Sequence, residues 1–235
     1  MTTEKLMQLA LERAGMESIP SDSTISVPGE NIKKLAFGID MESWIVDRHV
    51  APSGSTLVVG TAGNFVQSKR FGLLLDALAL VESDVNIHLR IAGSGPLEQV
   101  LKSKASELPG SNIEVEFLGQ VHDMRAFYDS CDLFTFPAKN ESFVLVVLEA
   151  LARGRPVIVG SDVGGCRELL QDRINGLVIE STTEAWAKSL TALYRVRTLL
   201  SSLQSGAEAS DLSRYDIRST RTALERLVNG KESGE

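Results

Sequence analysis

Between residues 55 and 180, short apolar runs alternate with longer segments in which apolar residues recur every three or four positions. The longer segments predict helices, as where Leu74 and Leu78 share one face. Runs such as residues 57–59 are continuously apolar, which is typical of parallel strands covered on both faces. The alternation predicts an α/β fold with a Rossmann-like, doubly wound parallel sheet of about six strands. We expect these strands at residues 56–60, 86–92, 112–118, 131–136, 156–160 and 176–179.

Segments of different character flank this alternating region. Residues 2–14 have the spacing of an amphipathic helix, and a polar connection with Ser and Pro residues follows them. We therefore expect an N-terminal helix and hinge segment at residues 1–54, a Rossmann-like domain at residues 55–230 and a frayed, charged tail at residues 231–235.

The end of the domain predicts two helices joined by a polar connection. Residues 181–184 form a candidate capping box at the start of the first helix, which carries Trp186 on its apolar face. The polar connection covers residues 201–213, and the second helix covers about residues 216–228.

The composition narrows the class of partner. The chain has 235 residues, 43% of them hydrophobic, and a net charge of −7, which argues against a nucleic-acid-binding surface. No apolar run approaches the roughly 18 residues of a transmembrane segment, and the first residues do not resemble a signal peptide. Cys131 and Cys166 lack metal-ligand spacing, so we interpret them as reduced thiols, with a disulfide as the alternative. We expect a cytoplasmic protein that contacts a membrane only through a partner, if at all.

Two carboxylates, Glu141 and Glu149, lie in a largely apolar stretch at residues 136–157. Eight helical positions correspond to about 12 Å along the axis and a drift of about 80° around it. A glycosidase pair flanks one bond, with carboxyl groups about 5 to 9.5 Å apart, and fits this spacing poorly. A sugar joined to a nucleotide fits it better. We expect both side chains to lie in one groove near Lys69, holding opposite ends of such a ligand.

This stretch resembles the glutamate-x7-glutamate signature of the family 4 retaining glycosyltransferases, which have the two-domain GT-B fold. Other matches to that family follow in the expected order along residues 32–228, including Gly38 and Asp40 at the hinge turn. The resemblance implies one half of a GT-B fold, the C-terminal nucleotide-sugar-binding domain. Within the signature the matching residues are Pro137, Glu141, Phe143, Glu149, Ala150, Ala152, Gly154, Pro156 and Val157.

The same resemblance implies the roles of the charged residues. Lys69 would meet the donor diphosphate and stabilise the charge that builds on the leaving group. Glu141 would touch hydroxyls of the donor sugar, and Glu149 would accept hydrogen bonds from the nucleotide ribose. The structural alternatives are a solvated lysine at a helix start and an exposed helical glutamate paired with an arginine.

Further substrate-binding residues follow from the resemblance. The turn after the first strand and residues 142–145, at a helix N-terminus, would meet the diphosphate. The turns after the second and third strands would form the wall near the nucleotide base. These residues are Gly63, Asn64, Gly93, Gly95, Val121, Ser142, Phe143, Val144 and Leu145.

The sequence departs from the family pattern at three of these positions and at one neighbouring position, Arg70. Asn64 stands where the family has an arginine, so we expect a weaker electrostatic clamp on the diphosphate. Arg70 occupies a position usually held by glycine. Ser142 and Val144 replace two more glycines, and a valine cannot take a positive φ cheaply, which alters the expected phosphate cradle.

These observations predict a glycosyltransferase that moves a sugar from a nucleotide-diphosphate donor to an acceptor. As the resemblance implies, no metal, cofactor or covalent protein intermediate is expected. The acceptor-binding half of the GT-B fold is missing, so either a partner chain supplies it or the sequence is a fragment. One alternative is a non-catalytic subunit that binds a nucleotide-sugar or a partner protein. Another is an unrelated Rossmann-type nucleotide-binding protein.

Overall fold

The computed structural model describes residues 24–27, 30–34, 38–45, 54–110, 112–139, 141, 144–166 and 168–229. The helix predicted at residues 2–14 and the tail predicted at residues 231–235 lie outside the described residues. The chain forms two compact units, one comprising Ile45–Ser210 and the other Met1–Trp44 together with Asp211–Glu235.

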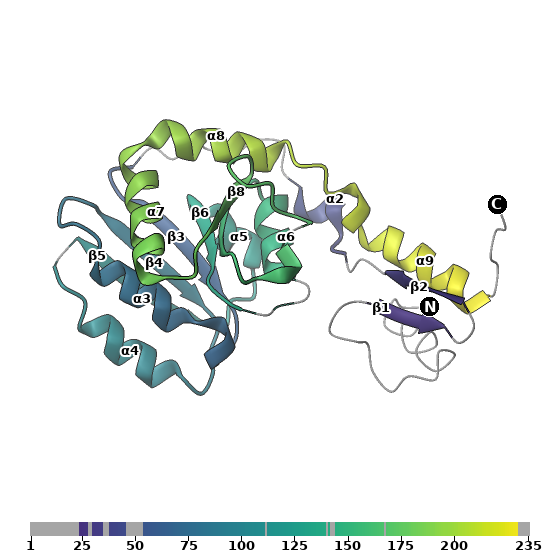
Figure 1. Cartoon of the computed structure of the whole chain (residues 1–235), viewed down its shortest axis with the longest axis horizontal. Coiled ribbons are helices and arrows are strands. Elements are labelled where there is room, and N and C mark those ends of the chain that lie inside the picture. Colours follow the sequence, from purple (N-terminus) through teal and green to yellow (C-terminus); the bar gives the residue numbers. More distant parts are fainter. Residues whose placement is uncertain are drawn as a thin grey trace. The chain divides into compact units, whose positions relative to one another are not determined.

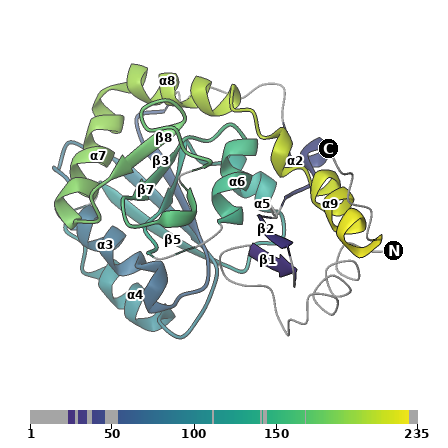
Figure 2. The same ribbon diagram turned by 45° about the vertical axis from the view of Figure 1, so that its right-hand side comes forward.

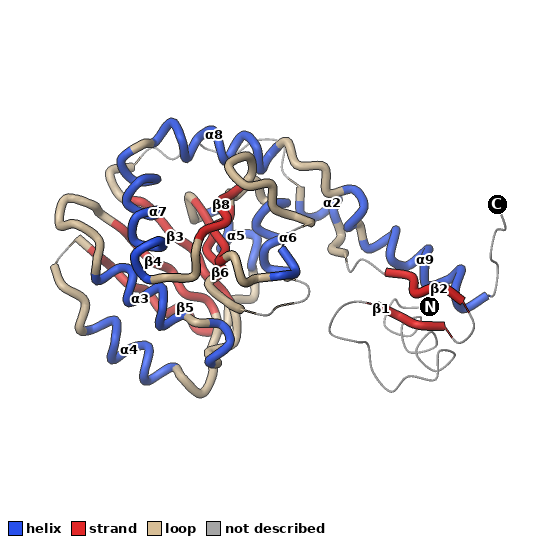
Figure 3. The backbone as a smooth tube through the Cα atoms, in the orientation of Figure 1, coloured by secondary structure: helices blue, strands red, loops and turns tan. Residues whose placement is uncertain are grey.

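The larger unit contains one parallel sheet of six strands, shown in red in Figure 3. Its strand order follows the 3-2-1-4-5-6 pattern of a Rossmann fold when the first strand of the sheet is counted as strand 1. The predicted fold class is therefore confirmed, and every predicted strand is present within two residues of its expected ends. From one edge to the other the strands are β5 (Ile113–Gly119), β4 (Ile87–Ala92), β3 (Leu57–Ala62), β6 (Leu133–Phe136), β7 (Val157–Gly160) and β8 (Gly176–Ile179).

Helices cover both faces of this sheet (Figures 1 and 2). Helices α3 (Phe71–Ala79), α4 (Glu98–Ser106) and α7 (Thr183–Arg195) share one face. Helices α5 (Met124–Asp129) and α6 (Leu145–Ala152) lie on the other. The continuous core between α3, α7 and the sheet is built from wholly buried side chains, including Leu57, Leu74, Leu89, Trp186 and Leu190.

Two local predictions at the end of the larger unit were wrong. Most of the predicted polar connection is helix α8 (Arg197–Glu208), because Leu200, Leu203 and Ala207 fall on one buried face despite the serines between them. Helix α7 is capped by Thr182, whose hydroxyl accepts from the backbone N–H of Ala185 at 3.3 Å. The predicted cap, Ser181, instead donates its hydroxyl to a carboxylate on the loop after β7.

The smaller unit joins segments from both ends of the chain. Ile39, in the turn matched to the family hinge, exchanges backbone hydrogen bonds with the segment before α9, donating to Tyr215 O and accepting from Ile217 N. A Cβ on Gly38 would lie 2.2 Å from the Tyr215 carbonyl oxygen, so this contact requires glycine. The elements are β1 (Thr24–Val27), β2 (Glu30–Lys34), α2 (Met41–Trp44), the short helix η3 (Ser213–Tyr215) and α9 (Ile217–Asn229).

Helix α9 confirms the final helix predicted from the sequence. It groups with the N-terminal segment, whereas the predicted division placed it in the Rossmann-like domain. Among the described residues, no helix has both the length and the apolar character needed to cross a lipid bilayer.

Candidate functional site

The strand order places the candidate site between β3 and β6. At this point successive connections turn to opposite sides of the sheet, and open α/β sheets bind ligands beyond the carboxyl ends of the strands there. The loop after β3 carries Gly63 and Asn64 and leads into the short helix η1 (Gln67–Lys69). The loop after β6 carries Glu141.

Lys69 and Glu141 form an ion pair at this position. The Lys69 ammonium lies 2.7 Å from Glu141 Oε1, and the two side chains are 21% and 24% exposed. The same ammonium lies 5.1 Å from the centre of the Phe136 ring, at the end of β6. The structure therefore brings together the two residues predicted to be catalytic, in a setting that is neither fully solvated nor fully buried.

Backbone hydrogen bonds connect the loops around this pair. The N–H of Gly165, in the short helix η2 (Gly164–Cys166), donates to the Glu141 carbonyl at 2.7 Å. The N–H of Lys139 donates to the Ser68 carbonyl at 3.1 Å. The loops after β3, β6 and β7 thus support one another, which fixes the backbone on both sides of the ion pair.

Three predicted pocket residues are glycines at a close approach of two loops. Gly93 has a φ of 129°, and a Cβ there would lie 2.0 Å from the Gly63 carbonyl oxygen. A Cβ on Gly95 would lie 2.7 Å from the Phe65 nitrogen. Larger residues would force the loops after β3 and β4 apart, so the glycines set the shape of this edge. Of the other predicted residues, Asn64 is exposed on the loop after β3, and Val121 is half-buried after β5.

The start of α6 tolerates the residue that replaces a family glycine. Val144 is buried and has a φ of −123°, so valine fits without the strain expected for a positive φ. Leu145 is the first residue of the helix and is 43% exposed. Ser142 and Phe143 lie outside the described residues, and their predicted roles remain predictions.

Arg70 has the left-handed backbone conformation for which glycine is favoured, with a φ of 51°. Its guanidinium lies 2.7 Å from the Asp162 carboxylate, on the loop after β7. Burial raises the pKa of Asp162, but hydrogen bonds from Ser181 and Arg70 outweigh it and hold the pKa below its ordinary value. Arg70 therefore connects the β3 and β7 loops.

Glu149 lies on α6 and has a different kind of partner. Its Oε2 accepts a hydrogen bond of 2.8 Å from the hydroxyl of Tyr128, a wholly buried residue of α5. Burial raises the pKa of Glu149, and the Tyr128 hydrogen bond offsets only part of this effect. Burial and then the Glu149 charge raise the pKa of Tyr128 as well. Within the described part of the chain, Glu149 is paired with this tyrosine and not with an arginine.

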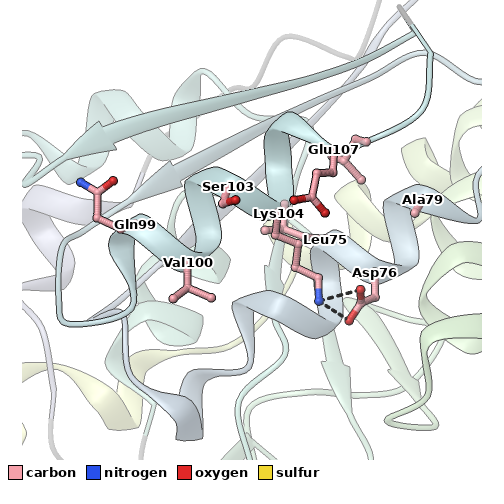
Figure 4. A pocket seen from close by; sticks show the side chains of 9 residues that line it. Leu75, Asp76, Ala79, Gln99, Val100, Ser103, Lys104 and Glu107 are labelled. Carbon is pink, nitrogen blue, oxygen red and sulfur yellow. Dashed lines mark hydrogen bonds and ion pairs between the residues drawn. The ribbon is translucent and has the colours of Figure 1, made fainter.

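The two carboxylates thus contact different elements, and the shared groove predicted for them remains a prediction. A hollow of about 730 Å³ lies elsewhere, between α3 and α4, beside the ion pair of Lys104 and Asp76 (Figure 4). None of the predicted site residues lines it.

Sequence reasoning missed two side chains that support the site. Tyr128 lies in a six-residue helix too short to show a periodic pattern, and it follows none of the family motifs. Asp162 follows β7, and nothing in the sequence indicated its contact with Arg70. Only the packing of separate elements reveals either contact.

The two cysteines are free and buried, as predicted for reduced thiols. Burial raises the pKa of Cys131 to about 11 and that of Cys166 to about 12, so neither is a ready nucleophile. No group of three or more His, Cys, Asp or Glu side chains suited to a metal ion occurs in the part of the chain that the structure describes.

Comparison with known proteins identifies the family. A family model described as Glycosyl transferases group 1 matches residues 56–195, which include all six strands of the parallel sheet and all the predicted site residues. The chain belongs to this glycosyltransferase family. Among curated relatives, a phosphatidyl-myo-inositol mannosyltransferase of Mycobacterium leprae is 33% identical over 86% of this chain and 52% of its own length. A D-inositol 3-phosphate glycosyltransferase of Corynebacterium urealyticum is 31% identical over 76% of this chain and 44% of its own length.

Solved structures of glycosyltransferases share the fold. Anabaena HepE, solved with UDP and glucose, superposes with a TM-score of 0.73 and 20% identity over 98% of this chain and 68% of that one. TarM of Staphylococcus aureus gives a TM-score of 0.64 and 21% identity over 79% of this chain and 38% of that one. The larger unit is therefore a Rossmann-like half of the GT-B type, and this family member spans about half the length of the curated relatives it matches.

Proposed function

We propose that the chain is the donor-binding part of a retaining glycosyltransferase, which transfers a sugar from a nucleotide-diphosphate donor to an acceptor. The observation that carries the proposal is the Lys69–Glu141 pair between β3 and β6. It supplies a cation for a diphosphate and a carboxylate for sugar hydroxyls where sheets of this topology bind ligands.

The ion pair can exchange partners when a donor binds. Both side chains are partly exposed, and a bound donor would give each a new polar partner, so that neither Lys69 nor Glu141 would be left as an unpaired, partly buried charge. The diphosphate would then take the Lys69 ammonium, which stabilises the charge that develops on the leaving group. Glu141 would turn to the hydroxyls of the donor sugar. Backbone N–H groups at residues 142–145, before and within the first turn of α6, would add donors to the diphosphate.

Glu149 would hold the other end of the donor. A carboxylate accepts hydrogen bonds from both hydroxyls of a ribose, and burial makes such partners valuable to a carboxylate whose partner among the described residues is a neutral hydroxyl. HepE was solved with UDP, so UDP is the first nucleotide to test.

The proposed enzyme also needs an acceptor-binding half, a supply of nucleotide-sugars and a positive charge for the diphosphate. The acceptor-binding half would come from a partner chain or from further residues of a longer protein. We place the enzyme in the cytoplasm, where nucleotide-sugars would reach it. Since Lys69 provides the positive charge, donor binding should survive EDTA.

Calorimetric titration with UDP, GDP and ADP and their sugars tests the proposal. We expect one nucleotide to bind, and Glu149→Ala to weaken its binding at least tenfold. Asp172→Ala, on the loop before β8, removes a carboxylate away from the site and serves as the control. An unchanged affinity in Glu149→Ala would refute the ribose role, and the absence of binding to all three nucleotides would refute the donor-binding function.

One observation favours a second candidate, a non-catalytic subunit that binds nucleotide-sugars. Asn64 replaces the family arginine, and the nearby Arg70 guanidinium is engaged by Asp162, so the diphosphate would meet fewer cations than usual. Donor hydrolysis or sugar transfer, measured with an acceptor-domain chain present and absent, separates the two candidates. Transfer with retention at the anomeric carbon supports the enzyme, whereas tight binding with neither reaction supports the subunit.

A further inference from the structure

We infer that Tyr128 is a positioning residue for nucleotide recognition, whose hydroxyl holds one oxygen of Glu149 so that the other faces the ribose. The inference rests on the proposed function, in which Glu149 binds the ribose. It adds a residue from a different helix, α5, to the recognition of the nucleotide.

The tyrosine ring is held firmly. Tyr128 is wholly buried and packs edge-on against Phe127 and Phe134, with ring centres 5.5 and 5.2 Å away. Such packing leaves the ring little freedom, so its hydroxyl occupies a fixed point beside α6. The aromatic cluster therefore also restricts the position of the acceptor that this hydroxyl binds.

Among the described residues, two acceptors on α6 lie within reach of the hydroxyl. One is Oε2 of Glu149 at 2.8 Å, and the other is the Val146 carbonyl oxygen at 3.2 Å. A hydroxyl has one proton to donate, and an ionised carboxylate forms the shorter and stronger hydrogen bond. The geometry therefore favours the bond to Glu149, with the carbonyl as a weaker secondary acceptor.

A neutral hydrogen-bond donor, such as a tyrosine, leaves a carboxylate able to accept hydrogen bonds from the hydroxyl groups of a ligand. An arginine at this place would occupy both oxygens and neutralise the charge. Tyr128 occupies one lone pair of Oε2 and leaves Oε1 and the full negative charge to the ligand. Because a glutamate side chain otherwise loses rotamer freedom on binding, fixing it beforehand lowers that entropic cost.

The test is a double-mutant cycle in which the affinity is measured for two forms of each nucleotide. UDP, GDP and ADP, and their 2′,3′-dideoxy analogues, are titrated calorimetrically into the full chain and into Tyr128→Phe, Glu149→Ala and the double variant. The matched control is Tyr194→Phe, which removes a tyrosine hydroxyl from α7, where it contacts Asn86. Thermal melts confirm that each variant is folded.

We expect Tyr128→Phe to weaken the binding of the natural nucleotide about tenfold, the size of a hydrogen bond to a charged group. The affinity for the dideoxy analogue should change less than twofold. The effect of Tyr128→Phe should vanish in the Glu149→Ala background, and Tyr194→Phe should bind both nucleotide forms as the wild type does.

Equal weakening of the binding of both nucleotide forms, or additive losses in the double variant, would show a packing role for Tyr128 and overturn the inference. If Glu149→Ala weakens binding but Tyr128→Phe does not, the inference alone fails. If Glu149→Ala has no effect, the ribose role in the proposed function fails with it.

Discussion

Glu141 and Glu149 are separated by eight positions, yet the structure gives them opposite surroundings. Glu141 lies in a loop and is paired with the ammonium of Lys69. Glu149 lies in a helix and is paired with the neutral hydroxyl of Tyr128. Among the described residues, the first carboxylate is paired with a cation, whereas the partner of the second is a neutral hydrogen-bond donor.

The difference shows how the partner of a carboxylate decides what it can do. The ion pair of Glu141 and Lys69 is partly exposed and can open when a ligand offers each charge a new partner, since neither is then left unpaired. A hydrogen bond from a buried tyrosine orders Glu149 without neutralising it, and burial raises the pKa of this carboxylate. The first site is therefore suited to exchange, and the second is organised before the ligand arrives.

The largest expected effect comes from breaking the exchangeable pair. Lys69→Met should lower the rate of sugar transfer or donor hydrolysis by about 10² to 10³, because one electrostatic group that stabilises the leaving group is lost. The free energy of unfolding should fall by about 1 to 3 kcal/mol, because Glu141 loses its partner at a place where only 24% of its side chain is exposed. Steady-state kinetics and urea unfolding measure the two quantities.

The matched control is Lys139→Met, which removes an exposed lysine from the loop that also carries Glu141. It should keep at least half of the activity. A similar loss in both variants would mean that general charge near the loop, and not the position of Lys69, supports the reaction.

A smaller effect distinguishes the two carboxylates by ligand. Glu141→Gln should weaken binding of a nucleotide-sugar roughly three- to tenfold, because an amide is a weaker acceptor than a carboxylate. Binding of the nucleotide diphosphate alone should stay the same or tighten, since Lys69 is released from its partner. Glu149→Gln should instead weaken both ligands by one common factor. Calorimetry with UDP and UDP-glucose, or the matching guanosine or adenosine pair, measures this, and identical patterns in the two variants would contradict separate roles.

The six strands, and with them the approach of Lys69 to Glu141, could be predicted from the periodicity of the sequence. The alternation of apolar runs gave the six strands, and the Rossmann order then brings the loops after the first and fourth strands together. Lys69 and Glu141 follow those two strands, so their approach could be expected. Their motif positions strengthened the expectation through the family resemblance.

The remaining parts depend on packing between elements that share no pattern. Tyr128 and Glu149 lie on two helices whose relative orientation the sequence does not encode locally. The left-handed backbone at Arg70 depends on the loop that leads into α3. Helix α8 was missed because its serines conceal an apolar face formed by Leu200 and Leu203, which only tertiary burial makes decisive.

The smallest expected effect concerns stability and pH. The folded-state pKa of Glu149 is raised above its ordinary value of 4.5, so between these two values the folded protein binds more protons than the unfolded chain. The contribution of Glu149 to stability is therefore greatest below pH 4.5, declines as pH rises through the folded-state pKa and is lowest at neutral pH. Glu149→Gln keeps an acceptor for Tyr128 and removes this penalty. At pH 7 it should raise the free energy of unfolding by up to about 1 kcal/mol.

The gain should shrink towards zero as the pH is lowered to 4, where Glu149 is protonated in both states. Urea unfolding of the wild type and Glu149→Gln at pH 4, 5, 6 and 7 gives this difference directly. Glu141→Gln serves as the comparison, because its carboxylate has a cation and its loss should bring no gain at pH 7. A constant difference between wild type and Glu149→Gln from pH 4 to 7 would mean that burial does not penalise this carboxylate. The contrast between the two sites would then rest on geometry alone.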